Sequence, residues 1–174
     1  MHLLPSTPAD IDEIFRLYTL ASAYQASVQS LVVWPAFERA MVAQELAEQR
    51  QWKLVIDNQI ACVWAITFDD PLIWEARNAD PALYLHRIAT NPQFRGRNMV
   101  KEIVQWAKHY AQQRGKRFVR LDTIGENKGL IAHYTACGFT YLGLAQLTNT
   151  QGLPPHYHHA TVSLFELPLP QEQP

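Results

Sequence analysis

The stretch Thr90-Asn91-Pro92-Gln93-Phe94-Arg95-Gly96-Arg97-Asn98-Met99 places a proline, two arginines and a glycine between two different periodicities. An apolar run typical of a strand precedes it, and a segment with helical spacing follows it. The glycine lets the backbone approach a ligand closely, and the first N–H groups of a helix have no partner within that helix. The helix dipole adds partial positive charge at the same end. This stretch therefore predicts a phosphate-binding turn.

Length and composition limit the classes of protein to which the chain can belong. It has 174 residues, of which 48% are hydrophobic and 18% charged, and its formal net charge is −1. This length suits one domain, and we predict a single domain over residues 1–174. The balanced charge indicates neither nucleic acid nor a membrane surface as a partner. The sequence shows no signal-peptide pattern and no run long enough to cross a membrane, so we expect a cytoplasmic protein.

The order of periodic segments predicts the fold class. Strands are expected at 2–5, 52–56, 60–68, 82–90, 117–123, 139–144 and 161–167, and helices after Thr7 and at 37–50, 98–114 and 127–137. We expect a surface loop over 69–81, a tight turn at 57–59 and a frayed tail from Pro168. Only the strand–helix–strand unit around the glycine turn requires a parallel crossover. The prediction is an α/β (α+β) fold with a mixed, mostly antiparallel central sheet of about seven strands, flanked by about four helices on its two faces.

Two blocks of sequence resemble a known family. The segment from Leu85 to Asn98, LHRIATNPQFRGRN, resembles the acetyl-CoA-binding core of the GNAT acetyltransferase superfamily, with its Q/R-x-x-G-x-G/A loop. A later block, Leu121-Asp122-Thr123 followed by Asn127, Tyr134 and Gly138-Phe139, resembles the family's strand–Asn–helix–Tyr–GF pattern. The resemblance covers about residues 83–143, the expected cofactor core. One position departs from it, because Asn98 stands where the family has Gly or Ala; Asn tolerates unusual backbone angles better than most residues.

The resemblance implies a GNAT-like fold, acetyl-CoA as donor and coenzyme A as product. It places the pyrophosphate on the backbone N–H groups of Arg95, Gly96, Arg97, Asn98 and Met99. The strand residues Ile88, Ala89 and Thr90 are then expected to pair with the pantetheine arm. The alternatives are that the two arginines form only a solvated helix start and that these three residues form an ordinary core strand.

Two residues of the second block also have roles by resemblance. Tyr134 aligns with a general acid that protonates the departing thiolate, and Asn127 with a residue that hydrogen-bonds the cofactor arm. Simpler explanations exist for both. Tyr134 could pack a helix onto the sheet, and Asn127 could serve only as a helix N-cap.

His86 is the candidate general base, because an imidazole with an ordinary pKa near 6.5 suits removal of a proton from an amine. Strand alternation puts His86 on the face of Tyr84 and Ile88, opposite Arg87. Asp122 is a second candidate base. The alternative for His86 is a half-buried structural histidine. The histidines at 156, 158 and 159 lack the spacing of a metal site, and we predict no metal.

The acceptor side is specified less well. Aromatic residues and carboxylates suited to a small cation occur at Trp34, Phe37, Trp64, Phe68, Trp74, Asp69, Asp70 and Glu75. Ordinary core aromatics with a solvated acidic loop explain the same residues. We expect transfer of an acetyl group from acetyl-CoA to a small-molecule primary amine by direct attack in a ternary complex. The alternatives are an acyl-CoA-binding module without catalysis and a peptide or protein N-acetyltransferase. Dimers are common in the family that the chain resembles, which leaves a homodimer open.

Overall fold

The computed structural model describes residues 1–28 and 32–170. Its strands are β1 (His2–Pro5), β2 (Gln51–Ile56), β3 (Gln59–Thr67), β4 (Ala82–Thr90), β5 (Phe118–Ile124), β6 (Thr140–Gln146) and β7 (Thr161–Pro168). Its α-helices are α1 (Ile11–Ser27), α2 (Arg39–Ala47), α3 (Pro71–Trp74), α4 (Met99–Gln112) and α5 (Lys128–Ala136).

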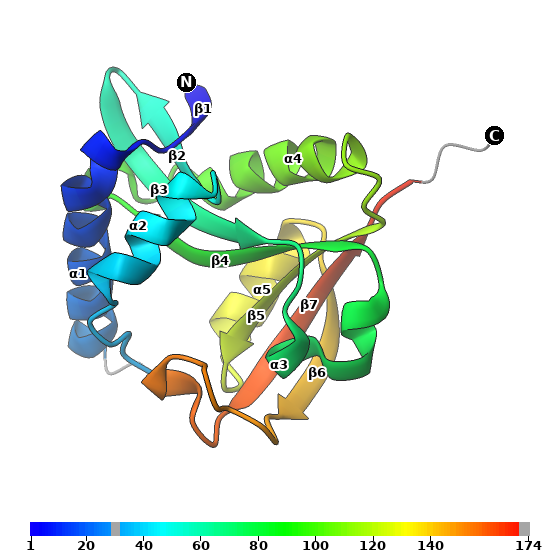
Figure 1. Cartoon of the computed structure of the whole chain (residues 1–174). Helices are drawn as coiled ribbons and strands as arrows, with labels where there is room; N and C mark the ends of the chain where they lie inside the picture. The colour runs from blue at the N-terminus through cyan, green and yellow to red at the C-terminus, as the bar shows by residue number, and fades with distance from the viewer. Residues whose placement is uncertain (29–31, 171–174) are drawn as a thin grey trace. The chain divides into compact units, whose positions relative to one another are not determined.

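The seven strands form one sheet in the order β1-β2-β3-β4-β5-β7-β6 (Figure 1). The β4–β5 pair is parallel, whereas β1–β2, β2–β3, β5–β7 and β6–β7 are antiparallel. The predicted mixed, mostly antiparallel sheet is confirmed. No helix within the described part of the chain is long and apolar enough to cross a membrane.

The chain forms two compact units. The first contains Met1–Ile66 and His86–Ile103, and the second contains Thr67–Leu85 and Val104–Pro174. Both β4 and α4 therefore contribute residues to each unit. The two units are described separately below.

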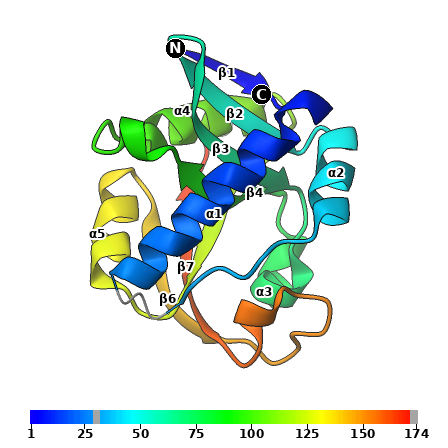
Figure 2. The same cartoon turned by 90° about the vertical axis from the view of Figure 1, so that its left-hand side faces the viewer.

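In the first unit, β2 and β3 form the predicted hairpin. Asp57 and Asn58 have φ of 48° and 60°, and Ile56 pairs with Gln59 across them. Positive φ at both central residues is the geometry that two-residue hairpins favour, and Asp and Asn accept it more readily than most side chains. Helices α1 and α2 pack together over one core, and Figure 2 shows the two helices. The buried members of that core are Ile14, Leu17, Tyr18, Val42, Leu46, Val63 and Ala89.

In the first unit, the helix start after Thr7 is confirmed, whereas that of α2 differs from the prediction. A 3-10 turn, Pro8–Asp10, precedes α1, and the Asp10 carboxylate accepts a hydrogen bond from the backbone N–H of Thr7 at 2.7 Å. Helix α2 begins at Arg39 rather than at residue 37. It also buries a carboxylate, Glu45, which is 5% exposed and which helical spacing alone does not identify.

In the second unit, successive residues of β7 point to opposite faces. Phe165 packs against Tyr134 of α5 with ring centroids 5.2 Å apart, whereas Leu164 joins a cluster that contains Ile73 and Trp74 of α3. Alternation along β7 thus lets α5 and α3 cover opposite faces of this part of the sheet. Asn127 caps α5 as predicted, accepting a hydrogen bond from the Leu130 N–H at 3.1 Å.

The prediction of a surface loop over 69–81 is wrong. This segment forms α3 and a 3-10 turn, Glu75–Ala79, and it buries Asp70, Ile73 and Trp74. The reason is tertiary, because Trp74 lies under the guanidinium of Arg120, whose carbon is 4.8 Å from the ring centroid. Arg120 is fully buried and forms ion pairs at 2.6 Å with both Asp80 and Glu166, so its charge is compensated.

The C-terminal segment is ordered further than predicted. Pro168 ends β7, and Leu169 is 5% exposed and donates its N–H to the Arg117 carbonyl at 2.8 Å. The prediction of a frayed tail is therefore wrong at these two positions, and residues 171–174 lie outside the described residues.

Candidate active site

The predicted phosphate-binding turn lies in the first unit and is anchored at its start by Asn91. The Asn91 backbone N–H donates to the Ala61 carbonyl at 2.9 Å, and its side-chain amide donates to the Ile60 carbonyl at 3.1 Å. Its side-chain oxygen accepts from the Gln93 N–H at 3.2 Å. One residue thus ties the end of β4 to β3 and begins the short 3-10 turn Pro92–Phe94.

The turn reaches α4 through two left-handed residues. Gly96 has φ of 79° and Asn98 has φ of 52°. A turn that leads into a helix N-terminus leaves backbone N–H groups without a partner in the helix, and such groups suit an anion. The prediction that Asn98 accepts an unusual backbone angle is confirmed. Residues 95–98 are exposed, whereas Met99 is 5% exposed and anchors the first turn of α4.

Both arginines of the turn lie over aromatic rings. The guanidinium carbon of Arg95 lies 4.1 Å from the ring centroid of Tyr24, and that of Arg97 lies 5.3 Å from the ring centroid of Phe94. A cation over the face of an aromatic ring is attracted by the ring's π electrons. Both arginines are exposed, and their role toward a ligand stays a prediction.

Strand β4 is irregular at Arg87. This residue has φ of 49°, which is left-handed and uncommon for a residue with a side chain. The Arg87 guanidinium reaches Glu45 and Tyr18, and Ala89 belongs to the core that Tyr18 also lines, so Arg87 and Ala89 face α1 and α2. Arg87 and Ala89 therefore share a face, as alternation along a strand predicts, although the backbone of β4 is left-handed at Arg87.

His86 is half-buried, and burial is the main cause of a pKa lowered to about 3. The positive charges of Arg87 and Arg50 lower it further. The expectation of an ordinary imidazole pKa is therefore wrong. His86 is neutral at physiological pH and can accept a proton, but a base with so low a pKa binds that proton weakly.

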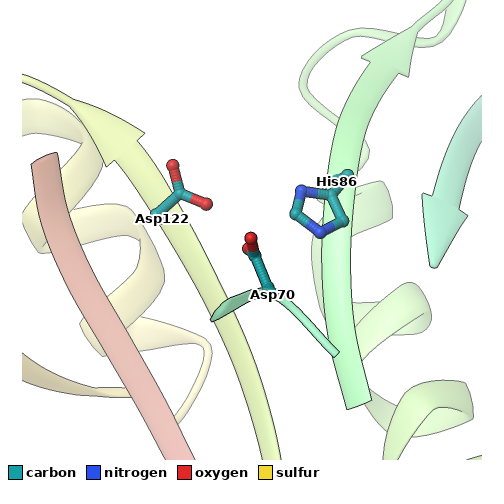
Figure 3. Close-up of side chains that lie close together, drawn as sticks. All are labelled: Asp70, His86 and Asp122. Carbon is teal, nitrogen blue, oxygen red and sulfur yellow. The ribbon is translucent and has the colours of Figure 1, made fainter. Parts of the chain in front are cut away.

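The second unit contains a pair of carboxylates. Figure 3 shows the side chains of Asp70, just before α3, and Asp122, on β5, pointing toward one another; His86 of β4 is labelled in the same view. Carboxylate oxygens of Asp70 and Asp122 lie within 4.8 Å of each other. The phenol of Tyr157 donates a hydrogen bond to Asp122 at 3.0 Å. Sequence reasoning named Asp122 as a secondary base and Asp70 only as a cation attractor.

Both carboxylates have raised pKa values. Burial raises the pKa of Asp70 to about 8, and the negative charges of Asp122 and Asp69 add to the effect. Burial also raises the pKa of Asp122 to about 6, against the hydrogen bond from Tyr157. Two such groups titrate as a coupled pair, and near neutral pH the pair holds about one proton. It can therefore act as a proton acceptor in the range where an enzyme would use one.

Tyr134 and Asn127 also lie in the second unit. The partly buried ring of Tyr134 packs edge-on against Phe139, with centroids 6.1 Å apart, and at a tilt against Phe165. Asn127 forms its cap hydrogen bond, as described above. Packing and capping thus account for part of each residue's presence, and the cofactor and catalytic roles of both stay predictions.

The five aromatic residues named for the acceptor side do not share one environment. Trp34 and Phe37 pack with Tyr18, whereas Trp64 is fully buried in β3. Trp74 lies under Arg120, as described above, and Phe68 is 37% exposed beneath Lys116. The explanation as core residues therefore holds for Trp64 and Trp74.

Comparisons with known proteins agree on one family. The model of the Acetyltransferase (GNAT) family matches residues 14–139. The uncharacterized N-acetyltransferase YesJ of Bacillus subtilis is 27% identical over 74 residues, which are 42% of this chain and 41% of that protein.

Solved structures show the same fold. A GNAT-family acetyltransferase from Listeria monocytogenes superimposes with a TM-score of 0.77 at 20% identity, covering 97% of this chain and 94% of the other. The Salmonella typhimurium protein yncA, solved with its cofactor acetyl-CoA, gives a TM-score of 0.69 at 11% identity over 100% of this chain and 96% of the other. Since the family model spans most of the chain, from within α1 to the segment between α5 and β6, the chain belongs to the acetyltransferase (GNAT) family.

Proposed function

We propose that this protein transfers an acetyl group from acetyl-CoA to a primary amine by direct attack in a ternary complex. The observation that carries the proposal is the exposed turn of Gly96 and Asn98, whose left-handed residues lead into the N-terminus of α4. Membership of the GNAT family and the acetyl-CoA bound to yncA support the choice of donor.

The donor would lie along the first unit. The backbone N–H groups from Arg95 to Met99 would bind the pyrophosphate, with the guanidinium groups of Arg95 and Arg97 adding charge-assisted donors. The backbone of Ile88, Ala89 and Thr90 would pair with the pantetheine arm. The Thr90 hydroxyl is 3.5 Å from the Cys62 sulfur, so a contact from Thr90 would come from its backbone.

The amine must lose a proton before or during its attack. His86 was the first candidate to take that proton, but its low pKa makes it a weak base. The Asp70–Asp122 pair is better matched, because its pKa values bracket neutral pH and a base is most effective when its pKa lies near the working pH. We therefore assign the proton to this pair, with His86 as the alternative.

Tyr134 completes the transfer. As the new carbon–nitrogen bond forms and the carbon–sulfur bond breaks, coenzyme A leaves as a thiolate, and the phenol of Tyr134 would donate a proton to it. Packing of the ring against Phe139 and Phe165 would hold the hydroxyl in place.

The first experiment is isothermal titration of the protein with acetyl-CoA and with coenzyme A, followed by an assay of thiol release with a panel of small amines and peptides. Micromolar binding and amine-dependent thiol release would support the proposal. Binding without release for any acceptor would favour an acyl-CoA-binding module. Release with peptides alone would favour a peptide or protein N-acetyltransferase.

A further inference from the structure

Arg87 holds a backbone conformation that its residue type disfavours. Its φ of 49° lies in the left-handed region, which Gly and Asn adopt far more readily than Arg. A conformation of this kind persists only where the surrounding structure imposes it. The contacts of the Arg87 side chain show what imposes it here.

The Arg87 guanidinium contacts residues of α1, of α2 and of the segment that precedes α2. It forms an ion pair with Glu45 of α2, donates from Nε to the Tyr18 hydroxyl of α1 at 3.4 Å, and lies 5.5 Å from the ring centroid of Phe37. The side chains of Arg87 and Glu45 are 15% and 6% exposed. Water therefore screens this pair little, and each charge needs the other.

Glu45 is held in turn. The Gln51 side-chain amide donates to Glu45 at 2.8 Å and to the Tyr18 hydroxyl at 3.1 Å, and Arg50 lies 3.6 Å from the Glu45 carboxylate. The Glu45 carboxylate, which accepts from Arg87, is thus also held in place by Gln51 and Arg50. The network joins α1, α2, β2 and β4 through buried polar groups.

The residues after Arg87 are the ones proposed to contact the donor. Asn91 anchors the far end of this segment to β3 through hydrogen bonds of 2.9 Å and 3.1 Å. Arg87 anchors the near end. The peptide groups of Ile88, Ala89 and Thr90 lie between these two fixed points.

We propose that Arg87 is a positioning residue: its buried bonds to Glu45 and Tyr18 hold β4 in a left-handed kink, which sets the direction of the peptide groups of Ile88–Thr90. The importance of that direction for catalysis rests on the function proposed above. Backbone N–H groups stabilise a developing oxyanion only where their direction is fixed beforehand.

Three variants separate the kink from the charge. Arg87→Ala removes the guanidinium and disfavours positive φ. Arg87→Gly removes the guanidinium but allows positive φ, while leaving Arg50 as the cation that faces Glu45. The double variant Arg87→Gly with Glu45→Gln allows the kink and removes the Glu45 charge as well. Asp12→Asn is the matched control, because it breaks an exposed ion pair, with Arg39, in the same unit.

We expect Arg87→Ala to lower kcat/KM for acetyl-CoA by about a hundredfold, because the peptide groups of Ile88–Thr90 would no longer point in the direction that the reaction needs. The double variant should recover to within about tenfold of the parent, and Asp12→Asn should stay within about twofold. Amide hydrogen exchange at Ile88, Ala89 and Thr90, measured without ligand, should be faster in Arg87→Ala than in the double variant.

Equal activity of Arg87→Ala and Asp12→Asn would overturn the proposal. Equal loss in Arg87→Ala and the double variant, with unchanged exchange at residues 88–90, would overturn it as well. If Arg87→Ala does not fold, the comparison is made between Arg87→Ala with Glu45→Gln and Arg87→Gly with Glu45→Gln, which differ only in how readily residue 87 adopts positive φ. A parent protein that neither binds acetyl-CoA nor acetylates an amine refutes the proposed function. The exchange rates at residues 88–90 then test only whether Arg87 holds the kink.

Discussion

The turn at residues 91–99 and the Asp70–Asp122 pair are built in opposite ways. The turn is a continuous stretch whose shape comes from the left-handed backbone of Gly96 and Asn98, and its central residues are exposed. The pair joins residues that are far apart in the sequence, and its acid–base properties come from burial and from the proximity of like charges. A few adjacent residues can thus specify a turn suited to an anion, whereas a base with a shifted pKa requires a folded environment.

The largest effect is expected from Asp122→Asn, which removes the member of the pair with the lower pKa. If this pair accepts the amine proton, kcat should fall by about 10²–10⁴ while the KM for acetyl-CoA changes little. Steady-state kinetics near pH 7.5 measure both constants. His86→Asn is the matched variant for the other candidate, and a large loss there with normal turnover in Asp122→Asn would move the base to His86.

Tyr134→Phe tests the proposed general acid, which lies in the second unit, as the Asp70–Asp122 pair does. The ring keeps its packing against Phe139 and Phe165, so only the hydroxyl is lost. We expect kcat to fall by about a hundredfold with unchanged affinity for coenzyme A. Turnover equal to that of the parent would remove Tyr134 from the mechanism and leave it a packing residue.

Gly96→Val tests the turn without touching the pair. A Cβ at Gly96 would meet nothing within 4 Å, so the cost comes from φ of 79° rather than from a clash. We expect the Kd for acetyl-CoA in isothermal titration to rise about tenfold, as a backbone penalty of about 1–2 kcal/mol implies. Asn98→Gly is the control, because glycine keeps the left-handed conformation and should bind at least as well as the parent. Weaker binding in Asn98→Gly would mean that the Asn98 side chain itself contacts the ligand.

The last prediction concerns the free energy of unfolding rather than activity. The folded pKa of Asp70 lies near 8, above its ordinary value of 3.8, so the native state binds a proton that the unfolded chain has already released. The parent should therefore lose stability as pH rises between these two values. Asp70→Asn removes this dependence, and the two pKa values imply that its advantage over the parent grows by about 3–4 kcal/mol from pH 5 to pH 8 in urea unfolding. An advantage that does not grow with pH would show that Asp70 is not protonated in the native state.

The features predicted correctly have short-range causes. The hairpin at Asp57 and Asn58, the left-handed Asn98 and the Asn127 cap each depend on a residue's own backbone preference or on a neighbour within three positions. The strand β4 and the helix α4 follow from periodicity. The prediction of a surface loop over 69–81 is wrong because the burial of this segment depends on Arg120, which lies far along the chain. In addition, a four-residue helix has no periodicity to detect.

The sequence by itself determined the sheet-forming pattern, the turn between β4 and α4 and the family resemblance, because these depend on residue types at fixed spacings. Only the tertiary structure decided the charge states of His86, Asp70 and Asp122 and the kink at Arg87. Each of these depends on how much water the fold removes and on which charges it brings near. Both quantities are set by segments distant in sequence, so no local pattern records them.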